Sequence, residues 1–161
     1  MNQAIQNIIQ HLQETLEGDP WYGRPVYAIL EEVHPAIVYD RPGKNDTSHS
    51  LIDLLYHMIT WSEFTLKRLE KDQEKDSAYS DKLDWRNIDP TVHTWENGLK
   101  EFWLLNNAII EILETKDDSL LEEKVDFREY NFGVLLNGLI EHHIYHLGQI
   151  AYVKKLLEGR E

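Results

Sequence analysis

The longest helical pattern in the sequence lies near its C-terminus and carries three closely spaced histidines. Its apolar residues recur at the i, i+3, i+4, i+7 spacing of one helix face. They are Phe132, Leu135, Leu136, Leu139, Ile140, Ile150, Val153 and Leu157. The pattern predicts an amphipathic helix over residues 132–158, which must bury one side against other elements.

The histidines of this segment have metal-ligand spacing. His142 and His146 are one helical turn apart, and two imidazoles so placed can hold one metal ion. His146 falls on the apolar face and His142 on its edge. His143 also points toward the apolar face, three residues from His146. The spacing therefore leaves open which pair would bind a metal, and also whether these side chains are simply packed in the core.

Three further long helices are predicted from the same periodicity, near residues 2–17, 50–71 and 90–115. Ser50 and Asp53 have the spacing of a capping box at the start of the second. Asp89 and Pro90 are suited to the N-cap and first position of the third, whose apolar face includes Val92 and Trp103. Pro25 to Val33 predicts an additional short helix with Pro25 in its first position.

The segments between these helices have the composition of connections. Residues 35–49 have the Pro, Gly, Asn and Asp content of a loop. Residues 71–84 are highly charged and predict a solvated connection, long enough to cross the bundle. Residues 124–128 alternate with period two and suggest a short extended piece before Asn131, the expected cap of the last helix.

Four long amphipathic helices without a strong strand pattern predict one all-α domain over residues 1–161, a four-helix bundle. Ligands for metals project inward from facing helices in such bundles. His57 lies at the edge of the apolar stripe of the second helix, where it is either a packing residue or a ligand. It could meet His142 and His146 in the interior.

Composition excludes several classes of function. The chain has no cysteine, so it forms no disulfide and offers no thiolate ligand or thiol nucleophile. A net charge of −13 opposes the phosphate backbone and argues against nucleic-acid binding. There is no apolar run of membrane-spanning length and no signal-peptide pattern, so a cytoplasmic location is expected. Five Trp and eight Tyr favour a homodimer, because aromatic side chains are enriched at interfaces.

Two motifs resemble those of the DinB/YfiT-like superfamily. Residues 50–57, Ser-Leu-Ile-Asp-Leu-Leu-Tyr-His, followed by Trp61, are similar to its motif on the second helix. His142-x-x-x-His146-x-Gly148-Gln149 is similar to its motif on the last helix. The loop at residues 20–23 and the connection between the second and third long helices are similar as well, so the resemblance covers nearly the whole chain.

The resemblance implies a four-helix bundle in up-down-down-up order, with a crossover between its second and third helices. It also implies a divalent metal, nickel or zinc, held by His57, His142 and His146, and thereby selects His142 over His143. Characterised members of the family include thiol-dependent S-transferases and isomerases. The resemblance thus implies a small-molecule substrate and a low-molecular-weight thiol as a possible cofactor.

Three hypotheses follow for the function. The first is a metal-dependent enzyme, a thiol S-transferase or a hydrolase, because three imidazoles leave an open metal position, the mark of a catalytic site. The second is a non-catalytic metal- or ligand-binding bundle, and the third is a structural dimer with packed histidines. The sequence identifies no catalytic residue. Glu141 falls on the solvent side of its helix. Gln149 lies nearer the histidines, where it is either a residue that supports a ligand or a polar residue of the helix packing.

Overall fold

The computed structural model describes residues 2–43, 47–73 and 77–159 of the chain, and these are predominantly helical. The elements are α1 (Gln3–Glu17), α2 (Val26–Glu31), η1 (Pro35–Ile37), α3 (Leu51–Leu69), α4 (Ser77–Leu83), α5 (Trp95–Glu114), η2 (Asp118–Glu122) and α6 (Phe132–Glu158). This confirms the predicted all-α fold. No helix in the described ranges combines the length and apolar character needed to cross a membrane.

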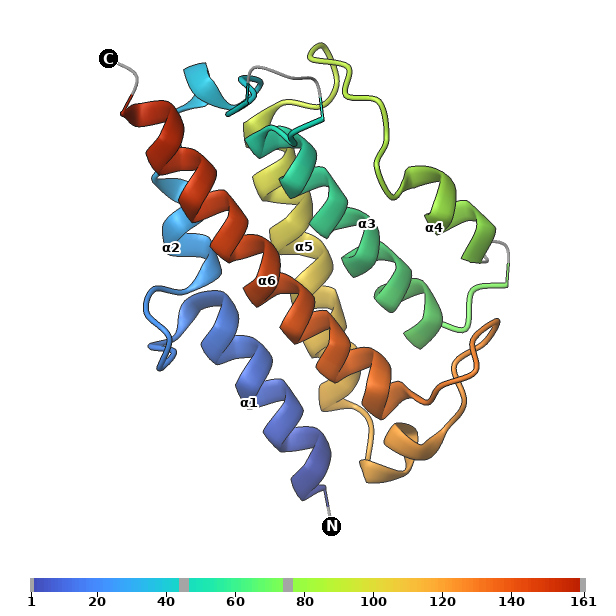
Figure 1. The fold of residues 1–161 in the computed structure, drawn as a ribbon. Coiled ribbons are helices and arrows are strands. Elements are labelled where there is room, and N and C mark those ends of the chain that lie inside the picture. Colours follow the sequence, from blue (N-terminus) through green and yellow to red (C-terminus); the bar gives the residue numbers. More distant parts are fainter. Residues whose placement is uncertain (1, 44–46, 74–76, 160–161) are drawn as a thin grey trace.

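The four long helices α1, α3, α5 and α6 pack side by side (Figure 1). Helices α1 and α6 run in one direction, whereas α3 and α5 run in the other. Helix α3 packs against both α5 and α6, and α1 packs against α5 and α6 from the other side of the bundle. The order along the chain is therefore up, down, down, up.

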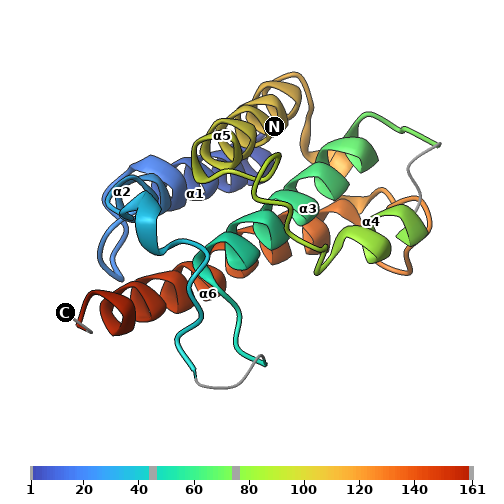
Figure 2. The ribbon, with the colours of Figure 1, turned by 90° about the horizontal axis from the view of Figure 1, so that it is seen from above.

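This order forces the chain to cross over between α3 and α5. Two consecutive helices that run in the same direction need a connection that returns along the whole bundle, about 28 Å for the 19 residues of α3 at 1.5 Å per residue. The connection contains α4, which packs against α3 on the side away from α1 (Figures 1 and 2). Within the predicted solvated connection over residues 71–84, the structure thus adds a short helix, α4 (Ser77–Leu83), that the charged composition did not indicate. Residues 74–76 of the connection lie outside the described part.

Helix α3 occupies the centre of this arrangement. Of its 19 residues, 15 are buried, because α5, α6 and the crossover cover it on three sides. His57, predicted at the edge of the apolar stripe, is consequently buried with a relative exposure of 6%. A helix covered in this way carries its polar side chains into the interior, where each needs a hydrogen-bond partner.

Capping residues fix the starts of α3 and α6 as predicted. The Asp53 amide donates to Ser50 Oγ at 3.3 Å, and the Ser50 amide donates to Asp53 Oδ2 at 2.9 Å, which completes the capping box. Asn131 Oδ1 accepts from the amide of Val134 at 3.0 Å. Each bond satisfies an amide that would otherwise lack a partner in the first helical turn.

The predicted start of α5 was wrong. Its N-cap is Thr94, whose hydroxyl accepts from the Asn97 amide at 3.2 Å, rather than Asp89. The Asp89 carboxylate instead accepts from the amide and hydroxyl of Thr91, and its carbonyl accepts from the His93 amide. These bonds close a local turn before the helix, which leaves Val92 59% exposed instead of buried.

Smaller differences follow from local geometry. Pro25 is the N-cap of α2, one position before the predicted one. The loop over residues 35–49 contains the short 3₁₀-helix η1. In the period-two segment, one isolated bridge pairs Lys124 with Asn131, and the described residues include no β-strand. Trp103, expected on the buried face of α5, is 50% exposed.

Removing the α5 cap tests where that helix starts. We expect Thr94→Ala to lower the free energy of unfolding by about 1 kcal/mol, because the Asn97 amide loses its acceptor. Thr94→Ser keeps a hydroxyl at the same position and should stay close to the wild type. Urea unfolding followed by circular dichroism measures both. Equal stability of the two variants would contradict Thr94 as the cap.

Candidate metal centre

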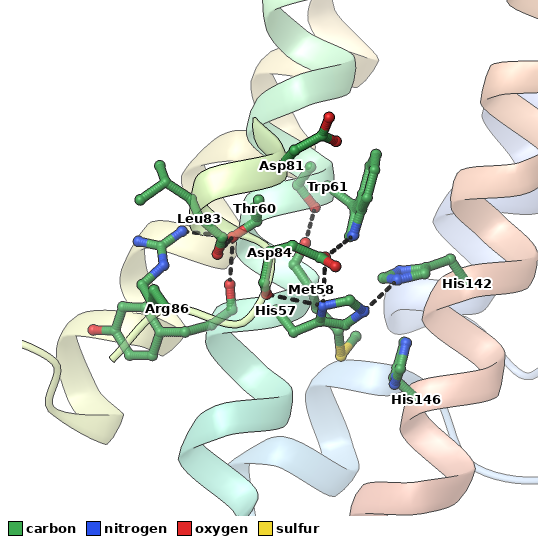
Figure 3. Close-up of polar contacts among 12 residues, drawn as sticks. His57, Met58, Thr60, Trp61, Asp81, Leu83, Asp84, Arg86, His142 and His146 are labelled. Carbon is green, nitrogen blue, oxygen red and sulfur yellow. Dashed lines mark hydrogen bonds and ion pairs between the residues drawn. The ribbon is translucent and has the colours of Figure 1, made fainter. Parts of the chain in front are cut away.

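Three histidines from two helices converge in the interior between α3 and α6 (Figure 3). His57 comes from α3, and His142 and His146 come from successive turns of α6. The Nε2 atoms of His57 and His142 are 2.9 Å apart, and the His146 ring centroid lies 4.4 Å from each of the other two. One ring nitrogen from each residue lies within 4.8 Å of the others. The structure thus brings together the three residues that the motifs selected.

His143 lies apart from this cluster. Its side chain is fully buried, and its Nε2 is 3.0 Å from Oδ1 of Asn106 on α5. Successive residues of a helix point about 100° apart, so the neighbour of His142 faces a different helix. His143 is therefore a hydrogen-bonded core residue, the alternative that spacing alone had left open.

Hydrogen bonds orient two of the three clustered rings. Nδ1 of His57 lies 3.1 Å from the carbonyl oxygen of Asp84 and 3.0 Å from its Oδ1. Nδ1 of His146 lies 2.6 Å from Oε1 of Gln149. Both partners are acceptors, so Nδ1 carries the proton in the neutral rings and Nε2 presents a lone pair. The chemistry of the donor set therefore fits a cation, and Gln149 lies where it can support a ligand.

Asp84 is a residue of this site that sequence reasoning missed. Its Oδ1 accepts from Trp61 Nε1 at 2.7 Å as well as from His57, so one carboxylate connects two turns of α3. It lies directly after α4, in a charged run without periodicity. The one sequence feature that could have pointed to Asp84 is Trp85, an aromatic residue that directly follows it at the end of the charged segment.

Trp85 covers one face of the His57 ring. The two rings are parallel within 6°, with centroids 3.9 Å apart. His49 stacks on the other face of Trp85 at 3.7 Å. No sequence pattern indicated a role for either residue, because their contact joins the loop before α3 to the crossover after it. The stack restricts the His57 ring from a third direction, after α3 and Asp84.

Burial keeps the imidazoles of the cluster neutral. It lowers the pKa of His142 to about 2 and that of His146 to about 4, with further lowering from the neighbouring histidines. Burial also lowers the pKa of His57, although its bonds to Asp84 act in the opposite direction. Neutral imidazole is the form that binds metals, so the rings are ready to coordinate at neutral pH.

Two cavities reach the cluster from different sides. A cavity of about 500 Å³ is lined mainly by polar residues, among them His57 and Arg86, together with Trp85. A smaller one of about 130 Å³ is lined mainly by apolar residues that include Trp61 and Leu139, together with His142. Glu141 is exposed, as predicted, and lines neither of them. A small molecule can therefore approach the histidines, as a reactive centre requires.

Fold and site together define a class: a bundle of long helices whose interior holds three imidazoles from two helices, able to hold a metal ion. A family model described as DinB superfamily matches residues 3–150. The chain belongs to the DinB superfamily. Neither the curated proteins nor the solved structures include a match to this sequence.

Acid should destabilise the metal-free protein. The unfolded chain binds protons at its histidines near pH 6.5, whereas the lowered pKa values of His142, His143 and His146 keep these rings neutral in the folded state. The contribution of these histidines to the free energy of unfolding is therefore fully present above pH 6.5. It is lost as the pH falls below 6.5, by about 1.4 kcal/mol per pH unit for each histidine.

Urea unfolding at pH 7.5, 6.5 and 5.5 measures this slope. His11→Gln is the matched control, because His11 is exposed on α1 and its replacement should leave the slope unchanged. Constant stability between pH 7.5 and 5.5 would show that the buried rings are not held neutral.

Proposed function

We propose that His57, His142 and His146 bind one divalent metal ion, nickel or zinc. The observation that carries the proposal is the convergence of three ring nitrogens, with the opposite nitrogens of His57 and His146 held by oxygen acceptors. Such outer hydrogen bonds orient the ring and fix its tautomer at protein metal sites. The Nε2 separation of 2.9 Å is close to the roughly 3.3 Å expected between two imidazoles on a tetrahedral zinc ion.

We further propose that the protein is a metal-dependent enzyme, a thiol-dependent S-transferase or a hydrolase. Three protein ligands leave a position open for a substrate or water. A metal ion bound there lowers the pKa of a bound water or thiol. Because the chain has no cysteine, a thiol would have to come from a low-molecular-weight cofactor. The cavities beside His57 and His142 support a small-molecule substrate.

The alternative is a bundle that binds a metal or a ligand without catalysis. The histidines would then be the same, so metal content does not separate the two functions. A panel of low-molecular-weight thiols with electrophilic acceptors, and a panel of hydrolase substrates, separate them. Turnover that requires both the metal and His142 would identify an enzyme.

Replacing single histidines tests the metal site. We expect His142→Ala and His146→Ala each to abolish stoichiometric metal, because two remaining imidazoles bind far more weakly than three. Inductively coupled plasma mass spectrometry on protein without a His-tag measures the metal content. The matched control is His143→Gln, whose amide can still donate to Asn106 and which should keep the metal.

Two other outcomes of the metal measurement would contradict the proposed ligands. Loss of metal in His143→Gln, with metal retained in His142→Ala, would make His143 and His146 the true pair. Unchanged metal content in all the variants would show that these histidines are only core residues.

The Asp84 carboxylate should strengthen metal binding through His57. Asp84→Ala removes its Oδ1 contact but keeps the carbonyl bond, so we expect metal affinity to fall by about tenfold, the lower end for such partners. Competition with a chromophoric chelator measures the affinity. Asp81→Ala, on the exposed side of α4, is the control and should bind like the wild type. Equal affinity of the two variants would contradict this role of Asp84.

A further inference from the structure

The larger cavity beside His57 is lined by two arginines, Arg41 and Arg86, in a protein of net charge −13. We propose that it binds the carboxylate of a small molecule, and that Arg86 is the residue that recognises it. We call it the arginine cavity; its walls include Arg41, Asp53, His57, Trp85 and Arg86. The inference deepens the proposed function, on which it rests, by naming the chemical class of the substrate.

Arg86 is held in place but uses few of its donors. Its Nη2 donates to the Thr60 hydroxyl at 2.6 Å, and its guanidinium lies over the Tyr56 ring, 5.6 Å from the centroid. Its Nε is buried without a hydrogen-bond partner. A guanidinium has five N–H donors in a planar fork that matches a carboxylate. The Nε proton is closed to solvent, so a ligand in the cavity would use the remaining terminal N–H donors of this rigid side chain.

The charge of Arg86 has no direct ionic partner. Among the described residues, no carboxylate forms a salt bridge with it. Glu101 is exposed and close enough for Arg86 to lower its pKa, although desolvation raises that pKa overall, so this carboxylate compensates the guanidinium only at a distance. Asp53 is engaged elsewhere, since its Oδ2 lies 3.1 Å from Arg41 and accepts from the Ser50 amide. A guanidinium without a salt-bridge partner favours a ligand with a single negative charge.

That balance favours a carboxylate over a phosphate ester. A phosphate ester carries nearly two charges at neutral pH, and the second would meet Asp53 in the same wall. His57 and His49 cover the two faces of the Trp85 ring, so the exposed part of this ring that borders the cavity is its apolar edge. A volume of about 500 Å³ is in the range of small-molecule sites. A compact carboxylate with a small apolar part fits these walls, and His57 in the same wall places it beside the proposed metal.

Calorimetric titration with benzoate tests this inference, with benzamide as the uncharged probe of the same shape. Wild-type protein freed of metal by chelation and gel filtration is used first, so that no ion in the site can attract the anion. We expect benzoate to bind and benzamide to bind at least about tenfold more weakly, the factor typical of a charged hydrogen bond. Phenyl phosphate should also bind more weakly than benzoate.

Variants assign the binding to Arg86. Arg86→Gln should weaken benzoate binding by about tenfold or more, whereas Arg24→Gln, which removes an exposed charge paired with Glu32, should not change it. Arg86→Lys keeps the charge without the planar fork, and should bind benzoate more weakly than the wild type but more tightly than Arg86→Gln. It also provides the test if Arg86→Gln does not fold.

The carboxylate site at Arg86 and the proposed metal site can fail independently, and the experiments separate the two cases. Benzoate binding that depends on Arg86 in a protein that never takes up metal would support the cavity and reject the metal. Metal binding with equal affinity for benzoate and benzamide, or benzoate affinity unchanged in the Arg86 variants, would overturn the carboxylate site and leave the metal site standing. Tighter binding of phenyl phosphate than of benzoate would overturn the choice of a carboxylate.

Discussion

The parallel run of α3 and α5 is the constraint on which the site depends. Helices that follow each other in one direction need a crossover, and here it runs back along α3. This path brings Asp84 to Nδ1 of His57 and Trp85 to the face of the same ring. An antiparallel hairpin between the two helices would need no such segment. The topology therefore supplies the outer contacts of the candidate centre as well as the fold.

The sequence predicted most of the fold, because each long helix carries an apolar stripe and several carry cap residues that act locally. Ser50 and Asn131 cap their helices as expected, since such bonds involve residues within a few positions. The same rule gave a wrong N-cap at Asp89, whose side chain accepts hydrogen bonds within a turn rather than at the start of a helix. Short-range rules cannot tell these uses apart, because both offer an oxygen to amides two or three positions away.

The candidate site was predictable in its histidines but not in their surroundings. The three ring positions follow from motif spacing, and Gln149 follows from its distance of one turn from His146. Asp84, Trp85 and Arg86 come from a segment that has no periodicity of its own. Their contacts with α3 cross 23 to 30 positions in sequence and exist only once the crossover is folded. Reasoning from local pattern cannot place such residues.

Asn106 explains why α6 presents one pair of histidines to α3. Its amide nitrogen donates to Ser62 of α3 at 3.3 Å, and its oxygen accepts from His143 of α6, so a single buried residue on α5 links three helices. The hydrogen bond from His143 to Asn106 of α5 fixes the rotation of α6 about its axis. His142 and His146, about 40° apart on the helix, then both face α3 and His57. A rotated α6 would leave buried polar groups unpaired, which is costly. The core histidine thus aims the two candidate ligands without touching a metal itself.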